Sequence, residues 1–184
     1  KFEVFIAQKA EEAKNIALTE ILPKLRIKSV SWGGSMSFVA TGLFHELKDK
    51  PELEVLNTFD RSLSNEEMMD LRRRSLMTDL FITGTNAVTE DGCLVNLDMV
   101  GNRVAAMMWG PKNVLLIIGR NKICSDINEA MSRIKTYAAP VNVINLDKKT
   151  PCKETGVCQD CKSPDRICNY WTIIEKSFIK HRIK

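Results

Sequence analysis

Apolar and polar positions along the chain change repeatedly between a helical period and the short runs typical of strands. Ser64 and Glu67 form a capping box that predicts the start of one helix. Apolar residues recur at helical spacing in three further segments: residues 8–22, 36–47 and 125–137. Runs of strand length occupy residues 2–6, 27–32, 53–56, 80–83, 104–108 and 114–118. Pro23 and Pro140 are expected to end the helices that precede them.

The order of these segments predicts an α/β protein. Strands that alternate with helices of about 10 to 15 residues are typical of an open, mostly parallel sheet with helices on both faces. Residues 114–118 are apolar at every position, as expected for a central strand that is covered on both sides. Asp91-Gly92 separates two short β-type runs and predicts a hairpin, which would be a local antiparallel insertion.

The composition changes at Lys148. From there to Asn169 the chain is rich in Cys, Lys, Asp and Pro, and two short β-like segments follow over residues 170–174 and 178–183. We therefore predict an α/β domain over residues 1–147 and a small Cys-rich, metal-binding subdomain over residues 148–184.

The overall composition limits the kinds of molecule that the protein is expected to bind. Hydrophobic residues make up 44% of the 184 residues and the net charge of +4 is spread along the chain, which argues against nucleic acid. No apolar stretch reaches the roughly 18 residues of a membrane span, and residues 1–7 are too short and mixed for a signal peptide. These features predict a cytoplasmic protein without membrane insertion. They leave the oligomeric state open, a homodimer included.

Four of the six cysteines lie close together, at Cys152, Cys158, Cys161 and Cys168. Sulfur-only ligands suit zinc or an iron–sulfur cluster. Only the middle two have the Cys-x2-Cys spacing of a zinc knuckle, and the wider spacings favour a [4Fe–4S] cluster over zinc. The alternatives are four reduced thiols in a surface loop, or two disulfides.

The other two cysteines, Cys93 and Cys124, stand alone and are expected to be small buried hydrophobic residues. The two histidines, His45 and His181, lie in unrelated segments. The sequence therefore identifies no nucleophile with a base beside it, and it leaves open whether the protein is an enzyme.

Two glycine turns follow predicted strands and are candidates for binding a small anionic metabolite. Glycine allows a ligand close to the backbone, and the amide groups that open a following helix favour an anion. A tight turn without a ligand explains the glycines equally well. The residues concerned are Gly33, Gly34 and Ser35 in one turn, and Gly84, Thr85 and Asn86 in the other.

Polar residues at positions 96, 98, 102 and 103 interrupt a segment that is otherwise apolar enough to be buried. For Asp98 and Arg103 a role in a ligand cleft is favoured over a purely structural one, and Asn102 is a third candidate there. Glu90 and Asp98 are weak candidates for general acid–base catalysis. For Glu90, which lies beside Asp91-Gly92, a place at a hairpin tip is the favoured interpretation.

Several separated motifs resemble the lactate-utilization (LUD) domain family. They are Ile82-Thr-Gly-Thr-Asn-Ala-Val-Thr-Glu-Asp-Gly-Cys-Leu-Val-Asn-Leu-Asp98, Gly101-Asn-Arg-Val-Ala-Ala, Gly110-Pro-Lys-Asn-Val, Trp32-Gly-Gly-Ser35 and Ala138-Ala-Pro140. The cysteine-bearing tail resembles a shorter branch of that family. The resemblance implies a fold like that of ribose-5-phosphate isomerase, glucosamine-6-phosphate deaminase and the CoA transferases. It also implies that phosphates or acyl groups bind at the turns that begin at Gly33 and Gly84.

Three functions follow from these expectations. The first is an iron–sulfur redox accessory in the oxidation of lactate or a similar organic acid, working with a redox partner protein. The second is an isomerase- or transferase-like enzyme that binds a phosphate or acyl ligand and carries a structural zinc. The third is a structural or regulatory subunit that binds a metabolite without reaction.

Overall fold

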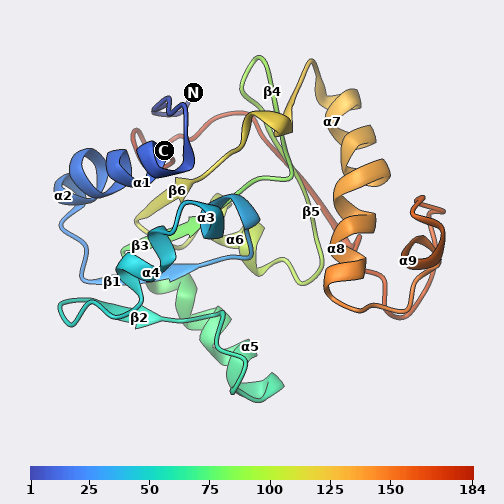
Figure 1. The fold of residues 1–184 in the computed structure, drawn as a ribbon, viewed down its shortest axis with the longest axis horizontal. Coiled ribbons are helices and arrows are strands. Elements are labelled where there is room, and N and C mark those ends of the chain that lie inside the picture. The colour runs from blue at the N-terminus through green and yellow to red at the C-terminus, as the bar shows by residue number, and fades with distance from the viewer. The chain divides into compact units, whose positions relative to one another are not determined.

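The computed structural model describes residues 1–184, which form two compact units (Figure 1). Unit 1 consists of Lys1–Gly84, Ala105–Gly119 and Ser177–Lys184, and unit 2 of Thr85–Val104 and Arg120–Lys176. Of the tail predicted as a subdomain, residues 148–176 belong to unit 2 and residues 177–184 to unit 1. No helix in either unit combines the length and the apolarity that a membrane crossing requires.

Unit 1 is built on a four-stranded sheet in which all strands are parallel. Its order is β2-β1-β3-β6, with β1 at Ser29–Trp32, β2 at Glu54–Leu56, β3 at Leu80–Thr83 and β6 at Asn113–Leu116. All four residues of β3, an interior strand, are buried. The strand predicted as central, residues 114–118, is instead β6 at one end of the sheet order, where it pairs with β3 and, through one isolated bridge, with Ile183. The expected α/β class with a mostly parallel sheet is confirmed.

Unit 1 also contains seven helical elements, and an eighth, α6, runs from unit 2 into unit 1. They are α1 (Ala10–Ile16), the π-helical segment η1 (Ala17–Ile21), α2 (Leu22–Leu25), α3 (Met36–Ala40), α4 (Leu43–Leu47), α5 (Asn65–Arg74), the 3-10 turn η2 (Ser75–Met77) and α6 (Asn102–Met108). Trp32 lies in the main core, fully buried with Phe38 and Leu80. On the other side of β1, Ser31 Oγ lies 2.8 Å from Ser75 Oγ, which ties η2 to the sheet.

Unit 2 contains a mixed sheet in the order β7-β4-β5-β8. The strands are β4 (Ala87–Thr89), β5 (Leu94–Asp98), β7 (Ile123–Cys124) and β8 (Tyr170–Ile174). β4 and β5 form the antiparallel hairpin that Asp91-Gly92 predicts, and Gly92 adopts a positive φ of 89° in its turn. β7 is parallel to β4, and β8 is antiparallel to β5.

Unit 2 also contains five helical elements. They are the 3-10 turn η3 (Arg120–Lys122), α7 (Ile127–Arg133), the π-helical segment η4 (Ile134–Ala138), α8 (Ala139–Asn145) and α9 (Pro151–Thr155). Asp126 caps α7 by accepting a hydrogen bond from the Glu129 amide. Ala130 and Ile134 pack with Val95 in the core of this unit.

Three predicted strands are wrong. Residues 104–108 belong to helix α6, because a short apolar run does not by itself separate a strand from a buried helix, and its Ala and Met residues favour a helix. Residues 2–6 form no strand. Residues 178–183 form none either, and only Ile183 makes an isolated parallel bridge, with Val114.

The predicted helix ends at Pro23 and Pro140 are also wrong. α2 continues to Leu25 and α8 to Asn145, and each proline follows a π-helical segment that ends two residues before it. Proline cannot donate to the preceding turn, and the wider π turn accommodates that lost hydrogen bond. The helix predicted over residues 36–47 is divided into α3 and α4 at Gly42, which has a positive φ of 74°.

Candidate functional site

The four clustered cysteines come from three parts of unit 2. Cys152 is buried on α9, Cys158 and Cys161 lie in the loop that follows, and Cys168 precedes β8. All six cysteines of the chain are free thiols, so the alternative of two disulfides is not what the structure shows. Cys93 and Cys124 are buried, as the sequence predicts.

All four clustered sulfur residues line one small cavity, whose volume is about 20 Å³. A space of that size holds about one water-sized particle. As the side chains are placed, no group of three or more His, Cys, Asp or Glu residues is arranged to hold a metal ion. The structure thus brings the four predicted ligands to one cavity, and a metal there stays a prediction.

Cationic side chains surround this cavity. Arg166 donates from Nε to the Cys168 carbonyl at 2.8 Å and from Nη1 to the Cys161 carbonyl at 2.7 Å, which links two of the thiol segments. Lys135, which also lines the cavity, pairs with Asp160 at 2.5 Å. Burial raises the pKa of Cys168 to about 11, and the neighbouring Cys158 adds to the increase. The thiols are therefore close enough to repel one another when ionised.

The two predicted glycine turns meet in unit 1 at Ser35 and Gly84. A Cβ atom on Gly84 would lie 2.5 Å from Ser35 Oγ and 3.2 Å from the Ile117 carbonyl oxygen, so the backbone approaches closely there. Ser35 caps α3 by accepting a hydrogen bond from the Phe38 amide at 3.3 Å. Glycine at 84 is thus required by packing, and Ser35 is occupied as a helix cap. Anion binding by Gly33, Gly34, Ser35 and Gly84 stays a prediction.

Asp98 and Arg103 form a buried ion pair in unit 2. Arg103 Nε lies 3.1 Å from Asp98 Oδ2, and only 12% and 8% of the two side chains are exposed. Asp98 Oδ1 also accepts hydrogen bonds from the amides of Val100 and Gly101. Because both of its oxygens already have partners, Asp98 is held as a turn-forming carboxylate.

The same guanidinium group organises the predicted ligand residues around it. Arg103 donates to Asn96 Oδ1 at 2.6 Å and to Asn86 Oδ1 at 2.9 Å. Thr85 Oγ1 donates to Asn96 Oδ1 at 3.1 Å. Burial lowers the pKa of Arg103, and the charge of Asp98 opposes that change. Thr85, Asn86, Asp98 and Arg103 are therefore parts of one polar network.

The remaining predicted residues lie elsewhere. Glu90 is exposed at the tip of the β4–β5 hairpin, which agrees with the interpretation favoured from the sequence. Asn102 begins α6 and is half-buried. A catalytic role for Glu90 or Asp98 is untested.

Sequence reasoning missed two cations, one half-buried and one buried. Lys122 is half-buried, and desolvation followed by the charges of Arg133 and Arg103 lowers its pKa to about 8. In unit 1, the buried Arg182 donates to three backbone carbonyls, those of residues 106, 107 and 111. Neither residue belongs to a local motif, so only the fold reveals its environment.

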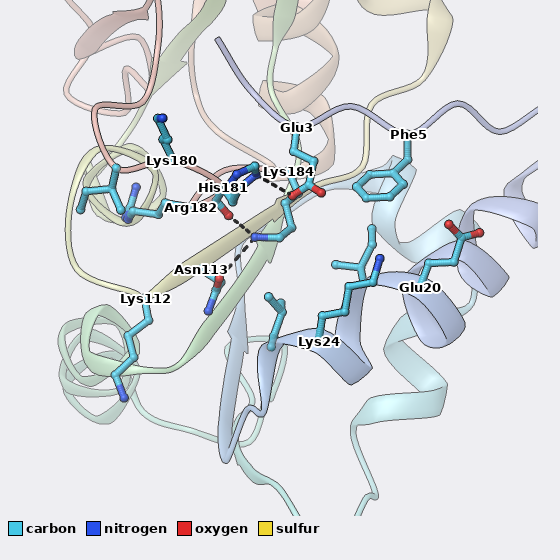
Figure 2. Close-up of a pocket in the computed structure, with 13 residues that line it drawn as sticks. Glu3, Phe5, Glu20, Lys24, Lys112, Asn113, Lys180, His181, Arg182 and Lys184 are labelled. Atoms are coloured by element: carbon cyan, nitrogen blue, oxygen red, sulfur yellow. Dashed lines mark hydrogen bonds and ion pairs between the residues drawn. The ribbon is translucent and has the colours of Figure 1, made fainter.

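A larger cavity of about 320 Å³ lies in unit 1 beside the last residues of the chain (Figure 2). Lys184 Nζ donates to Asn113 Oδ1 at 3.3 Å, and His181 Nδ1 lies 3.5 Å from Glu3 Oε2. The other lysines that line it are exposed. Surface lysines alone define no ligand, and we assign none to this cavity.

The architecture is that of an α/β protein with a parallel four-stranded sheet and a second, mixed sheet. A family model described as the LUD domain matches residues 1–184, so the chain belongs to the LUD domain family, which is associated with lactate utilization. It is also similar to a solved DUF162 family protein from Deinococcus radiodurans, with 14% identity over 66% of this chain and 78% of that chain and a TM-score of 0.31. A comparison with curated proteins finds no match.

Proposed function

We propose that this LUD-family protein is a redox accessory in organic-acid utilization and that Cys152, Cys158, Cys161 and Cys168 hold a metal centre. The centre proposed first is a [4Fe–4S] cluster, which supplies one-electron transfer when bound. The observation that carries the proposal is that all four residues line one cavity although they come from three different segments. A redox partner protein and a cytoplasmic location belong to the same proposal.

The donor set fits such a centre. Four thiolates are the usual protein ligands of iron–sulfur clusters and of structural zinc, and neither requires a fifth protein ligand. Arg166 and Lys135 place positive charge beside the cavity, which offsets the negative charge of bound thiolates. The Arg166 hydrogen bonds to the Cys161 and Cys168 carbonyls also hold two of the ligand segments together.

The size of the cavity favours zinc as the alternative occupant. About 20 Å³ accommodates a single ion after small side-chain adjustments, whereas a four-iron cluster requires the loop around Cys158 and Cys161 to move outward. Both of these residues are partly exposed, so the loop is not locked into the core. With zinc, the protein would be a metabolite-binding enzyme or subunit whose tail is stabilised by the metal.

Metal analysis of protein purified without oxygen tests the proposal. We expect iron and acid-labile sulfide in the wild-type protein, a broad absorption near about 400 nm, and reversible bleaching by dithionite. Cys158→Ser and Cys161→Ser should each lose the metal, because a serine hydroxyl is a poor ligand for these metals at neutral pH.

Cys124→Ala is the matched control, since Cys124 is buried in the core of the same unit and does not line the cavity. It should retain the metal of the wild-type protein. Zinc without iron would refute the redox role and support the alternative. Unchanged metal content in Cys158→Ser would refute the site itself.

The metabolite side of the proposal is a small anion that binds near the residues that the family resemblance indicates. Two separate places are candidates, the turn at Gly33, Gly34 and Ser35 in unit 1 and the polar groups of Asn86 and Arg103 in unit 2. Equilibrium binding of lactate and of phosphate to the purified protein tests this part. If neither lactate nor phosphate binds, the metabolite part of the proposal is wrong and only the metal centre remains.

A further inference from the structure

Two guanidinium groups and one ammonium group gather in unit 2 at the start of β4. Arg103 Nη2 donates to Asn86 Oδ1 at 2.9 Å, and Arg133 Nη1 donates to the carbonyl of the same residue at 2.8 Å. Arg133 Nε also donates to the carbonyl of Asn121, the residue immediately before Lys122, at 3.1 Å. The hydrogen bonds therefore converge on one region that holds all three cations.

The charges in this region do not balance. Arg103 is paired with Asp98, but neither Lys122 nor Arg133 forms an ion pair with any carboxylate. Arg133 instead lies over the ring of Tyr137, 5.4 Å from its centre, which holds the guanidinium in place without neutralising it. Positive charges brought together away from water destabilise a fold unless an anion compensates them.

Three hydrogen-bond donors in the same network have no acceptor in the protein. They are the Lys122 ammonium, Arg133 Nη2 and Asn96 Nδ2, and the last belongs to a fully buried side chain. Asn96 Oδ1 accepts from Arg103, Thr85 and the Asn86 amide, so the orientation of its amide is fixed and Nδ2 remains the donor. Only Asn96 Nδ2 is cut off from solvent, and because buried polar groups normally have partners, this donor indicates a missing acceptor; the other two donors remain accessible to a ligand.

We propose that Lys122 and Arg133 bind a small oxyanion, the carboxylate or phosphate group of a metabolite, beside the Arg103–Asn96 network. Such a group carries the negative charge and the acceptor atoms that this region lacks. The lowered pKa of Lys122, to about 8, agrees with an ammonium group that has no negative partner in the free protein. The inference deepens the proposed function by naming the place of its anionic metabolite, and it does not depend on a metal at the thiols.

Isothermal titration at constant ionic strength and about pH 7 tests the site with two probes, sodium phosphate and sodium acetate. The wild-type protein should bind at least one of them, and the stronger probe identifies the chemical class of the metabolite. Lys122→Met and Arg133→Met should each weaken that binding by about tenfold or more, the value of one charge-assisted hydrogen bond.

Lys176→Met is the matched control, because Lys176 is an exposed lysine of the same unit that forms no ion pair or side-chain hydrogen bond. It should bind as the wild type does, and circular dichroism confirms that each variant is folded. Wild-type protein that binds neither probe, or Lys122→Met and Arg133→Met proteins that both bind normally, would overturn the inference. Cys158→Ser should lose the metal and still bind the anion, so the two proposals fail separately.

Discussion

Arg182 in unit 1 is a buried cation and Lys122 in unit 2 is a half-buried one, and their surroundings differ. The guanidinium of Arg182 donates to three carbonyl oxygens at 2.7 to 3.0 Å, so its hydrogen bonds are used within the fold. Lys122 has two cationic neighbours and no acceptor. Arg182 therefore stabilises the fold by itself. Lys122 lacks a negative partner in the protein, and we expect a bound anion to supply it.

The largest expected effect is the loss of stability in Arg182→Met. Three buried carbonyls would lose their donor, and we expect the free energy of unfolding to fall by about 2–4 kcal/mol. Urea unfolding followed by circular dichroism measures the change. Lys180→Met is the control, because Lys180 is exposed nearby in the sequence. An Arg182→Met protein as stable as this control would contradict the structural role.

Lys122→Met should change stability in the opposite direction. Methionine has a similar length and removes an uncompensated charge, so we expect a gain on the order of 1–2 kcal/mol in protein free of anions. The same urea experiment without phosphate measures it. A loss of stability would mean that Lys122 has a partner within the protein, and it would end the contrast with Arg182.

The pH dependence of that gain follows from the pKa of Lys122. The folded-state value is about 8 and the ordinary value is 10.5, so between these pH values the unfolded chain binds more protons. The contribution of Lys122 to stability therefore rises with pH over this window. The advantage of Lys122→Met should be constant below about pH 8 and shrink as the pH approaches 10.5. An advantage that grows with pH would show that the pKa is not lowered.

The smallest expected effects come from two buried hydroxyl groups, one in each unit. Thr83 Oγ1 in unit 1 and Thr172 Oγ1 in unit 2 have no hydrogen-bond partner. Thr83→Val and Thr172→Val should leave the free energy of unfolding unchanged or raise it by up to about 1 kcal/mol, because each removes an unsatisfied group at similar volume. A loss above about 1 kcal/mol in thermal or urea unfolding would reveal a partner for that hydroxyl.

Local signals predicted those elements of the fold that depend on neighbouring residues. The Ser64–Glu67 capping box is present, with both of its hydrogen bonds. The Asp91-Gly92 hairpin and the buried strand β3 also follow from short sequence patterns. Helix α6 was not predicted, because its apolar run is as compatible with a strand as with a helix.

The candidate sites show the same limit. Clustered cysteines are visible as a motif, and Arg103 was recognisable as a polar residue in an apolar segment. Lys122 and Arg133 are ordinary residues of their local sequence, and they become notable only because the fold brings their charges together near Arg103 and leaves them without carboxylates. Long-range charge balance is a property of tertiary structure, and no short pattern encodes it.

Unit 1 is assembled from three stretches of chain that include both the first and the last residues. Ile183 bridges to Val114, and Arg182 donates to the carbonyls of residues 106, 107 and 111, so unit 1 depends on residues that are synthesised after all of unit 2. During synthesis, these contacts of the parallel sheet therefore cannot form until the chain of unit 2 has been made. Deleting residues 182–184 should consequently disturb unit 1 more than the cysteine-bearing stretch of unit 2.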